Sequence, residues 1–75
     1  MIIDYISFVD FLADASIQYE KLRAGDPSVR YGQVYFNLLH EARPDIANEL
    51  RGSSLDPFHR DAVSDETHAF VEYKW

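Results

Sequence analysis

The chain has 75 residues, 47% of them apolar, and its 13 acidic residues against 7 lysines and arginines give a net charge of −6. A chain of this length forms one domain with a small core, and the charge disfavours binding to nucleic-acid phosphates or to an anionic membrane surface. Because the sequence contains no cysteine, disulfides and thiolate metal sites are excluded.

The N-terminal stretch does not have the pattern of a targeting segment. It lacks a basic region, and Asp4 and Asp10 interrupt its apolar residues. No window of the sequence has the length and apolarity of a membrane span. We therefore expect a single helical domain over residues 1–75, located in the cytoplasm and independent of membranes.

Residues 4–24 are predicted to form the first helix, because apolar side chains recur there at the three-four spacing of a core face. Gly25 follows as the residue that ends the helix. The predicted core face consists of Tyr5, Phe8, Val9, Leu12, Ala15, Tyr19 and Leu22.

A second apolar group, Ile6, Ala13 and Ile17, lies on the flank of this face, while Asp10 and Asp14 lie on the solvent side. The apolar arc is therefore wider than packing on one neighbour requires. Two interpretations remain open: the helix is sandwiched between two others, or its flank contacts another chain.

Residues 26–44 are predicted to form a central helix. Asp26 can cap its N-terminus, Pro27 suits the first helical position, and Pro44 cannot continue it. The short Gly25-Asp26-Pro27 joint predicts that the first two helices pack as a hairpin. One broad apolar arc of the central helix comprises Tyr31, Val34, Tyr35, Phe36, Leu38, Leu39 and Ala42.

The C-terminal part is predicted to contain shorter helices. Residues 44–51 begin with a proline and are followed by Gly52, and Asp56-Pro57 repeats the cap-and-proline start of a helical turn through Arg60. Ser64 and the acids after it favour a last helix, although the alternation of aromatic and β-branched residues near the end favours a strand. Since a lone strand would have no partner, helix is the prediction.

Together these segments predict an all-α fold: a compact small bundle of three to five helices, with two longer N-terminal helices as a hairpin and shorter C-terminal helices.

The sequence offers little support for catalysis or metal binding. It has no phosphate-binding glycine-rich loop, no serine flanked by glycines, and no histidine pair at metal-binding spacing. His40, His59 and His68 lie on three different predicted elements, so a metal site would require them to converge with Glu41 or Asp61. We therefore predict a protein that is not an enzyme and has no cofactor or metal ion.

Arg30, Gln33 and Asn37 form a polar stripe along the central helix. Asparagine is unfavourable in the middle of a helix, which indicates a fixed hydrogen-bond partner for Asn37. That partner is either a buried backbone group near the Asp56-Pro57-Phe58 turn or another macromolecule. Within the chain, Arg30 is expected to pair with Glu41 or with an acid of the first helix.

The block Arg30-Tyr-Gly-Gln-Val-Tyr-Phe-Asn37, followed by Pro44-Asp-Ile-Ala, Gly52 and Asp56-Pro57-Phe58, resembles small uncharacterised proteins encoded by bacteriophages and prophages. In these proteins an Arg-x-Gly-Gln-x-x-x-Asn block precedes a proline and an Asp-Pro-Phe block. The resemblance covers about residues 19–61 and departs at His59, where the family often has tyrosine. It implies a phage or prophage source and no particular activity.

The sequence thus predicts a small acidic interaction protein that binds a bacterial host protein, for example one of antiviral defence, and modulates or inhibits it. The alternatives are a self-assembling structural or accessory protein, as a homo-oligomer, and an acidic mimic of nucleic acid. Direct nucleic-acid binding is not expected. The predicted partner-binding residues are Ile6, Ala13 and Ile17 for apolar contact, Asp10 and Asp14 for electrostatic steering, and Arg30, Gln33 and Asn37 for hydrogen bonds.

Overall fold

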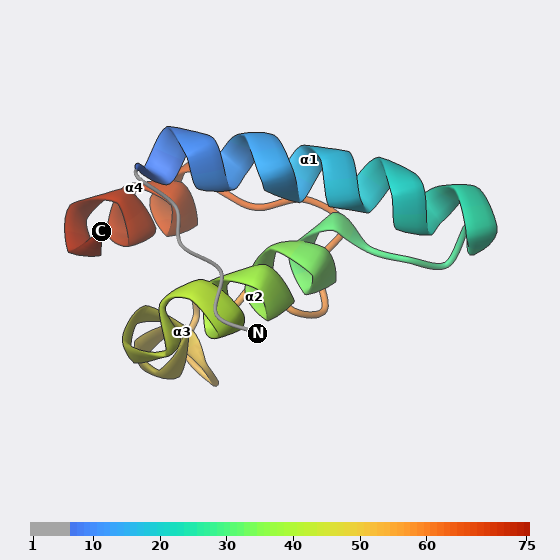
Figure 1. Cartoon of the computed structure of the whole chain (residues 1–75). Coiled ribbons are helices and arrows are strands. Elements are labelled where there is room, and N and C mark those ends of the chain that lie inside the picture. The colour runs from blue at the N-terminus through green and yellow to red at the C-terminus, as the bar shows by residue number, and fades with distance from the viewer. Residues whose placement is uncertain (1–6) are drawn as a thin grey trace.

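The computed structural model describes residues 7–75 and confirms the all-α class: this part of the chain forms four helices and no strand (Figure 1). The helices are α1 (Phe8–Gly25), α2 (Tyr31–Ala42), α3 (Pro44–Leu50) and α4 (Asp65–Lys74). The helix predicted for the last segment is therefore correct. None of the helices in the described range is long and apolar enough to cross a membrane.

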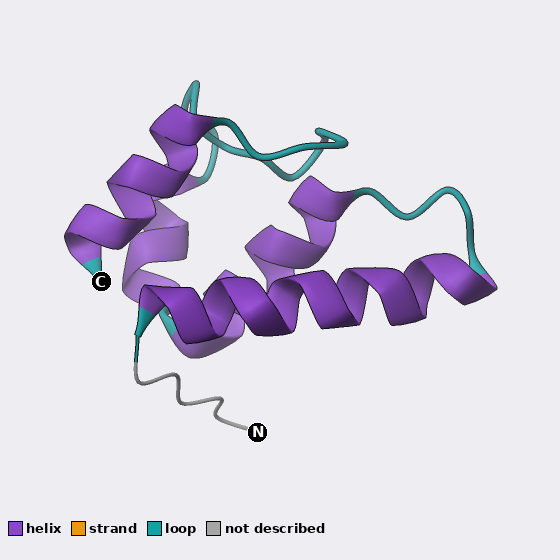
Figure 2. Cartoon of the chain, turned by 90° about the horizontal axis from the view of Figure 1, so that it is seen from above, coloured by secondary structure: helices purple, strands orange, loops and turns teal. Residues whose placement is uncertain are grey.

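The longest helix, α1, runs along one side of the molecule (Figure 1). The chain then turns back, and α2 crosses α1 obliquely and packs against both α1 and α3 (Figure 2). The segment after α3 carries the chain back towards α1, so that α4 ends near the start of α1. There the ring of Trp75 lies 6.3 Å from Phe8 and 5.3 Å from Phe11, between ring centroids.

The start of α1 is set by Ser7, whose backbone is extended and whose hydroxyl accepts a hydrogen bond from the Asp10 amide at 3.3 Å. This is an N-terminal cap, so the helix begins at Phe8 and not at residue 4 as predicted. The predicted core residue Tyr5 and flank residue Ile6 lie outside the described residues.

The predicted start of the central helix is wrong. Asp26 does not cap α2; its carboxylate accepts hydrogen bonds from the amide of Ser28 at 3.0 Å and from the Ser28 hydroxyl at 2.6 Å. An aspartate that bonds the backbone two residues later stabilises a turn. Consequently α2 begins only at Tyr31, and a short loop separates it from α1.

The short third helix begins at Pro44 as predicted and ends at Leu50, one residue before the predicted end. Pro44 occupies its first turn, and Gly52 follows its end with a φ of 75°, a left-handed conformation that favours glycine. The helical turn expected at residues 57–60 is instead a single hydrogen-bonded turn, in which the Arg60 amide donates to the Pro57 carbonyl at 2.9 Å. Asp56 stabilises the same segment by accepting from the amides of Gly52 and Phe58 at 2.9 and 3.0 Å.

The core lies between α1, α2, α3 and the C-terminal half of α4. Its fully buried large side chains are Phe11, Tyr35, Leu39, Ile46, Leu50, Pro57 and Val71. Phe11 was not among the predicted core residues, although its ring packs 4.9 Å from Tyr35. Conversely, Val9 and Leu22 were expected in the core and are exposed. The buried face of α1 is therefore turned about the helix axis relative to the prediction, towards Phe8, Phe11 and Ala15.

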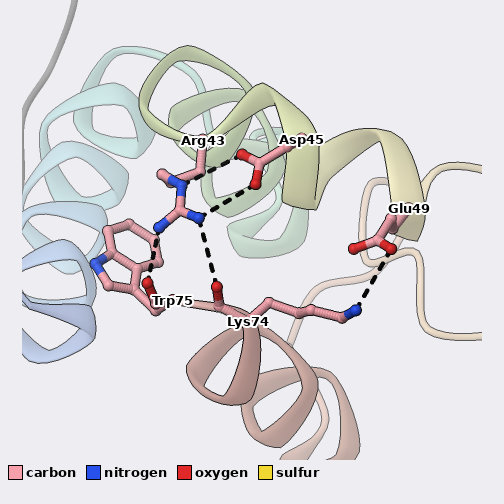
Figure 3. Close-up of polar contacts among 5 residues, drawn as sticks. All are labelled: Arg43, Asp45, Glu49, Lys74 and Trp75. Carbon is pink, nitrogen blue, oxygen red and sulfur yellow. Dashed lines mark hydrogen bonds and ion pairs between the residues drawn. The ribbon is translucent and has the colours of Figure 1, made fainter.

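Polar contacts fix the end of α4 to the junction between α2 and α3 (Figure 3). Arg43, which lies at that junction, donates to the backbone carbonyls of Trp75 at 2.9 Å and of Lys74 at 3.4 Å. The same guanidinium forms an ion pair with the Asp45 carboxylate at 3.2 Å. Its guanidinium also lies 5.5 Å from the centre of the Trp75 ring. Lys74 pairs with Glu49 at 3.5 Å, so α4 is attached to α3 as well.

Candidate functional site

The start of α2 is hydrogen-bonded to the loop segment at residues 57–60. The Arg30 guanidinium donates to the carbonyl oxygen of His59 at 2.6 Å and lies 3.7 Å from a carboxylate oxygen of Asp61. Two residues later, the Gly32 amide donates to the carbonyl oxygen of Arg60 at 3.0 Å. Arg30 therefore pairs with Asp61, and the predicted pairing with Glu41 or with an acid of the first helix is wrong.

Gly32 permits this contact because it has no side chain. A Cβ atom at this position would lie 2.5 Å from the Arg60 carbonyl oxygen and even closer to that of Pro57. Real Cβ atoms do not approach backbone atoms so closely, hence only glycine fits. The Arg-x-Gly and Asp-Pro-Phe blocks, which are distant in sequence, thus form one structural unit.

The remaining two residues of the polar stripe line a hollow between α1 and α2. Gln33 is half-buried and Asn37 is exposed, and the hollow has a volume of about 300 Å³. None of the described residues around it is charged; besides Gln33 and Asn37 they are Gln18, Leu22, Val29, Val34 and Leu38. We call this the amide-lined hollow.

A second hollow, of about 350 Å³, lies on the other side of Asn37 and is lined by Phe36, Asn37, His40, Arg51, Asp56, Phe58 and His59. Asn37 therefore lies between two recesses. Within residues 7–75 its side chain forms no hydrogen bond, so the buried backbone partner expected for it is not present in this range. We call this recess the histidine-lined hollow.

The outward side of α1 carries an apolar ridge, Val9, Ala13 and Ile17, which are spaced four residues apart and are all exposed. The expectation that another helix of the chain covers the flank is therefore wrong for Ala13 and Ile17. At 3.6 residues per turn, Asp10 and Asp14 follow one edge of this α1 ridge. Asp10 is exposed, whereas Asp14 is half-buried and accepts a hydrogen bond from Gln18 at 3.4 Å.

The three histidines do not come together. His40 and His59 line the same hollow, but His68 lies in the core region, where its Nδ1 atom is 3.3 Å from the Tyr35 hydroxyl. Burial lowers the pKa of His68, and the charge of Asp65 opposes this effect. Burial also raises the pKa of Tyr35, which keeps its phenol protonated. Within the described part of the chain, no group of three histidines or acids is arranged to hold a metal ion.

The sequence predicted residues of two of these features, although not the features themselves, and missed the third. It selected Asn37, which lines the amide-lined hollow, and Ile17, which belongs to the exposed α1 ridge. It did not anticipate the histidine-lined hollow, because that recess is assembled from α2, the end of α3 and the turn at residues 56–59. The signal available was the pair of blocks Arg-x-Gly and Asp-Pro-Phe, whose mutual contact only the fold reveals.

Comparison with known proteins does not place the chain in a family. No family model, no curated protein and no solved structure matches it.

Proposed function

We propose that this protein is a small, acidic, non-catalytic interaction module, encoded by a phage or prophage, which binds a protein of the bacterial host cytoplasm and modulates or inhibits it. The observation that carries the proposal is the α1 ridge. Val9 is 68% exposed and Ile17 is 50% exposed, although apolar side chains gain free energy when they leave water. A domain that leaves such a row uncovered on its longest helix has a surface suited to a partner.

The charge around the ridge indicates the chemistry of the partner. Residues 8–20 contain the acids Asp10, Asp14 and Glu20 and no lysine or arginine. A partner with an apolar centre and a basic rim would complement this surface, because opposite charges at the rim steer association. Covering each of Val9 and Ile17 would contribute on the order of 1 kcal/mol.

We also propose that α1 and α2 act as one antiparallel hairpin that presents the ridge as a rigid unit. The contact between the two helices supports this, and so does the hydrogen-bonded turn at Asp26 and Ser28, which joins them. A rigid helix loses little conformational entropy when it binds, which favours affinity.

The test uses the tagged full chain as bait in bacterial lysate, beside the double variant Val9→Ser/Ile17→Ser. Serine removes the apolar contact without changing the charge. The control is Tyr73→Ser, which removes a side chain that is 80% exposed on α4 and is not part of the ridge. We expect one protein to be captured by the wild type and by the control, and its purified form to bind the double variant about tenfold or more weakly, which is about 1.4 kcal/mol.

Two results would contradict the proposal. One is equal binding of the captured protein by the double variant. The other is a wild-type chain that forms a defined oligomer in light scattering, which the double variant abolishes, with no second protein captured. That outcome would identify the ridge as a self-assembly surface.

A further inference from the structure

We propose that the histidine-lined hollow binds an oxyanion, a phosphate or carboxylate group, carried on a small molecule with a flat apolar part. The groups that would hold the charge are Arg51, His40 and His59, which come from three different elements. This site is separate from the α1 ridge, because none of the described residues of α1 lines it. The inference therefore does not depend on the proposed function.

Arg51 is the principal group. It follows α3, and its guanidinium lies 5.8 Å from the centre of the Phe36 ring, at the edge of the hollow. Within residues 7–75 its side chain has neither an ion pair nor a hydrogen bond, whereas Arg30 and Arg43 are both paired with aspartates. A guanidinium has five N–H donors in a planar fork that matches an oxyanion.

The two histidines add donors on neighbouring sides. His40 lies on α2, and the ring of His59 packs edge-on against Phe58, with 4.9 Å between ring centroids. The backbone of His59 is held in place because its carbonyl accepts the 2.6 Å hydrogen bond from Arg30. Arg30 is thus a positioning residue for this site. An imidazole donates one N–H when neutral and two when protonated, so both histidines can bind an anion.

The acid in the hollow has its own hydrogen-bond partners in the backbone. Both oxygens of the Asp56 carboxylate are engaged by backbone amides, those of Gly52 at 2.9 Å and Phe58 at 3.0 Å. The charged and titratable groups that line the hollow are His40, Arg51, Asp56 and His59. The formal charges of Arg51 and Asp56 offset each other, so the directed N–H donors of Arg51 and of the two imidazoles would hold the anion.

The aromatic side chains that line the hollow indicate the chemistry of the uncharged part of the ligand. Phe36 and Phe58 form an edge-to-face pair, with 5.8 Å between ring centroids, and both line the hollow. Its volume of about 350 Å³ lies within the range of small-molecule sites, roughly 300–1,000 Å³. Aromatic walls favour a flat apolar group beside the anion. The adjacent amide of Asn37 can donate a further hydrogen bond.

The experiment is an NMR titration of the isotope-labelled full chain with phenyl phosphate, benzoate and inorganic phosphate as probes. We expect saturable shifts of the amides at residues 51–59 and of the His40 and His59 rings, with a Kd on the order of 1–10 mM for at least one aromatic probe. Inorganic phosphate should bind more weakly, because it lacks the apolar part. Tighter binding of phenyl phosphate would assign a phosphate ligand, and tighter binding of benzoate a carboxylate.

Variants distinguish binding at this site from unspecific electrostatic attraction of the anion to the protein. Arg51→Gln should weaken binding about tenfold, and Arg51→Lys should weaken it less, because lysine keeps the charge but loses the planar fork. The control is Arg23→Gln, which removes the same charge from the far end of α1, where Arg23 contacts Tyr19. His59→Gln is a second variant of the site. Each variant's own amide spectrum shows whether the fold is intact.

The histidines supply a second readout. We expect His59→Gln to weaken the binding of the aromatic probes several-fold, because it removes an imidazole donor from the hollow. Absence of saturable shifts with all three probes would overturn the proposal. So would equal binding by Arg51→Gln and Arg23→Gln, or shifts centred away from residues 51–59.

Discussion

The backbone amide of Gly32, in the first turn of α2, donates a 3.0 Å hydrogen bond to the carbonyl oxygen of Arg60. This bond joins two segments that are far apart in sequence and brings His59 to the rim of the histidine-lined hollow. Both the fold and the proposed anion site depend on this close approach.

Replacing Gly32 by alanine should destabilise the protein strongly. The new Cβ atom would collide with two backbone carbonyls, and backbone cannot move aside as a flexible side chain can. We expect the free energy of unfolding to fall by roughly 2–3 kcal/mol or more, measured by urea unfolding. Gly25→Ala is the matched control: no described atom lies within 4 Å of its Cβ position, so it should be neutral or stabilising by about 0.5–1 kcal/mol. Equal stability of the two variants would show that the contact is absent.

Arg43→Gln should loosen the attachment of α4. The variant loses the hydrogen bonds to the Trp75 and Lys74 carbonyls and the contact with the Trp75 ring. Because Arg43 is partly exposed, we expect a loss of about 1–2 kcal/mol in the free energy of unfolding, followed by Trp75 fluorescence. Arg60→Gln changes the charge equally at an exposed position and should have little effect. If both variants unfold at the same urea concentration as the wild type, the Arg43 contacts do not stabilise the fold.

His68 should make stability depend on pH. Burial lowers its pKa in the folded state below the ordinary value of 6.5, so the unfolded chain binds the proton more tightly. The stabilising contribution of neutral His68 is present above the unfolded-state pKa of 6.5. It is lost as the pH falls from that value through the lower pKa of the folded state. The melting temperature should therefore fall less steeply between about pH 7 and about pH 5 in His68→Gln than in the wild type. His40→Gln, at an exposed position, is the control, and identical slopes for all three proteins would contradict the expectation.

Thr67 is a buried polar side chain, 2% exposed, whose hydroxyl donates to the Leu55 carbonyl at 2.8 Å. Thr67→Val keeps the shape but leaves that carbonyl without its donor, which should cost about 1–2 kcal/mol in chemical unfolding. Thr67→Ser keeps the hydroxyl and removes one methyl group, so a loss of about 1 kcal/mol or less is expected. If Thr67→Val is more stable than Thr67→Ser, then packing, and not the hydrogen bond, stabilises α4 at this point.

The sequence by itself determined the helical class and the elements whose ends carry local signals. Pro44 and Gly52 delimit α3, and Ser64 caps α4 by accepting from the Thr67 amide at 3.2 Å. These interactions span only a few residues, so they act in the same way whatever the rest of the chain does. The apolar arc of α2 was also predictable, because its buried residues other than Gly32, namely Val34, Tyr35, Phe36 and Leu39, all belong to it.

Only the tertiary structure decided which side of α1 is buried and which residues meet. A wide apolar arc allows several orientations of a helix, and contact with Tyr35 and Trp75 selects the one that buries Phe11 and exposes the α1 ridge. Asp26 shows a local competition that the sequence left undecided, because one carboxylate can cap a helix or stabilise a turn. The histidine-lined hollow arises from contacts between segments distant in sequence, and no local propensity encodes such a meeting.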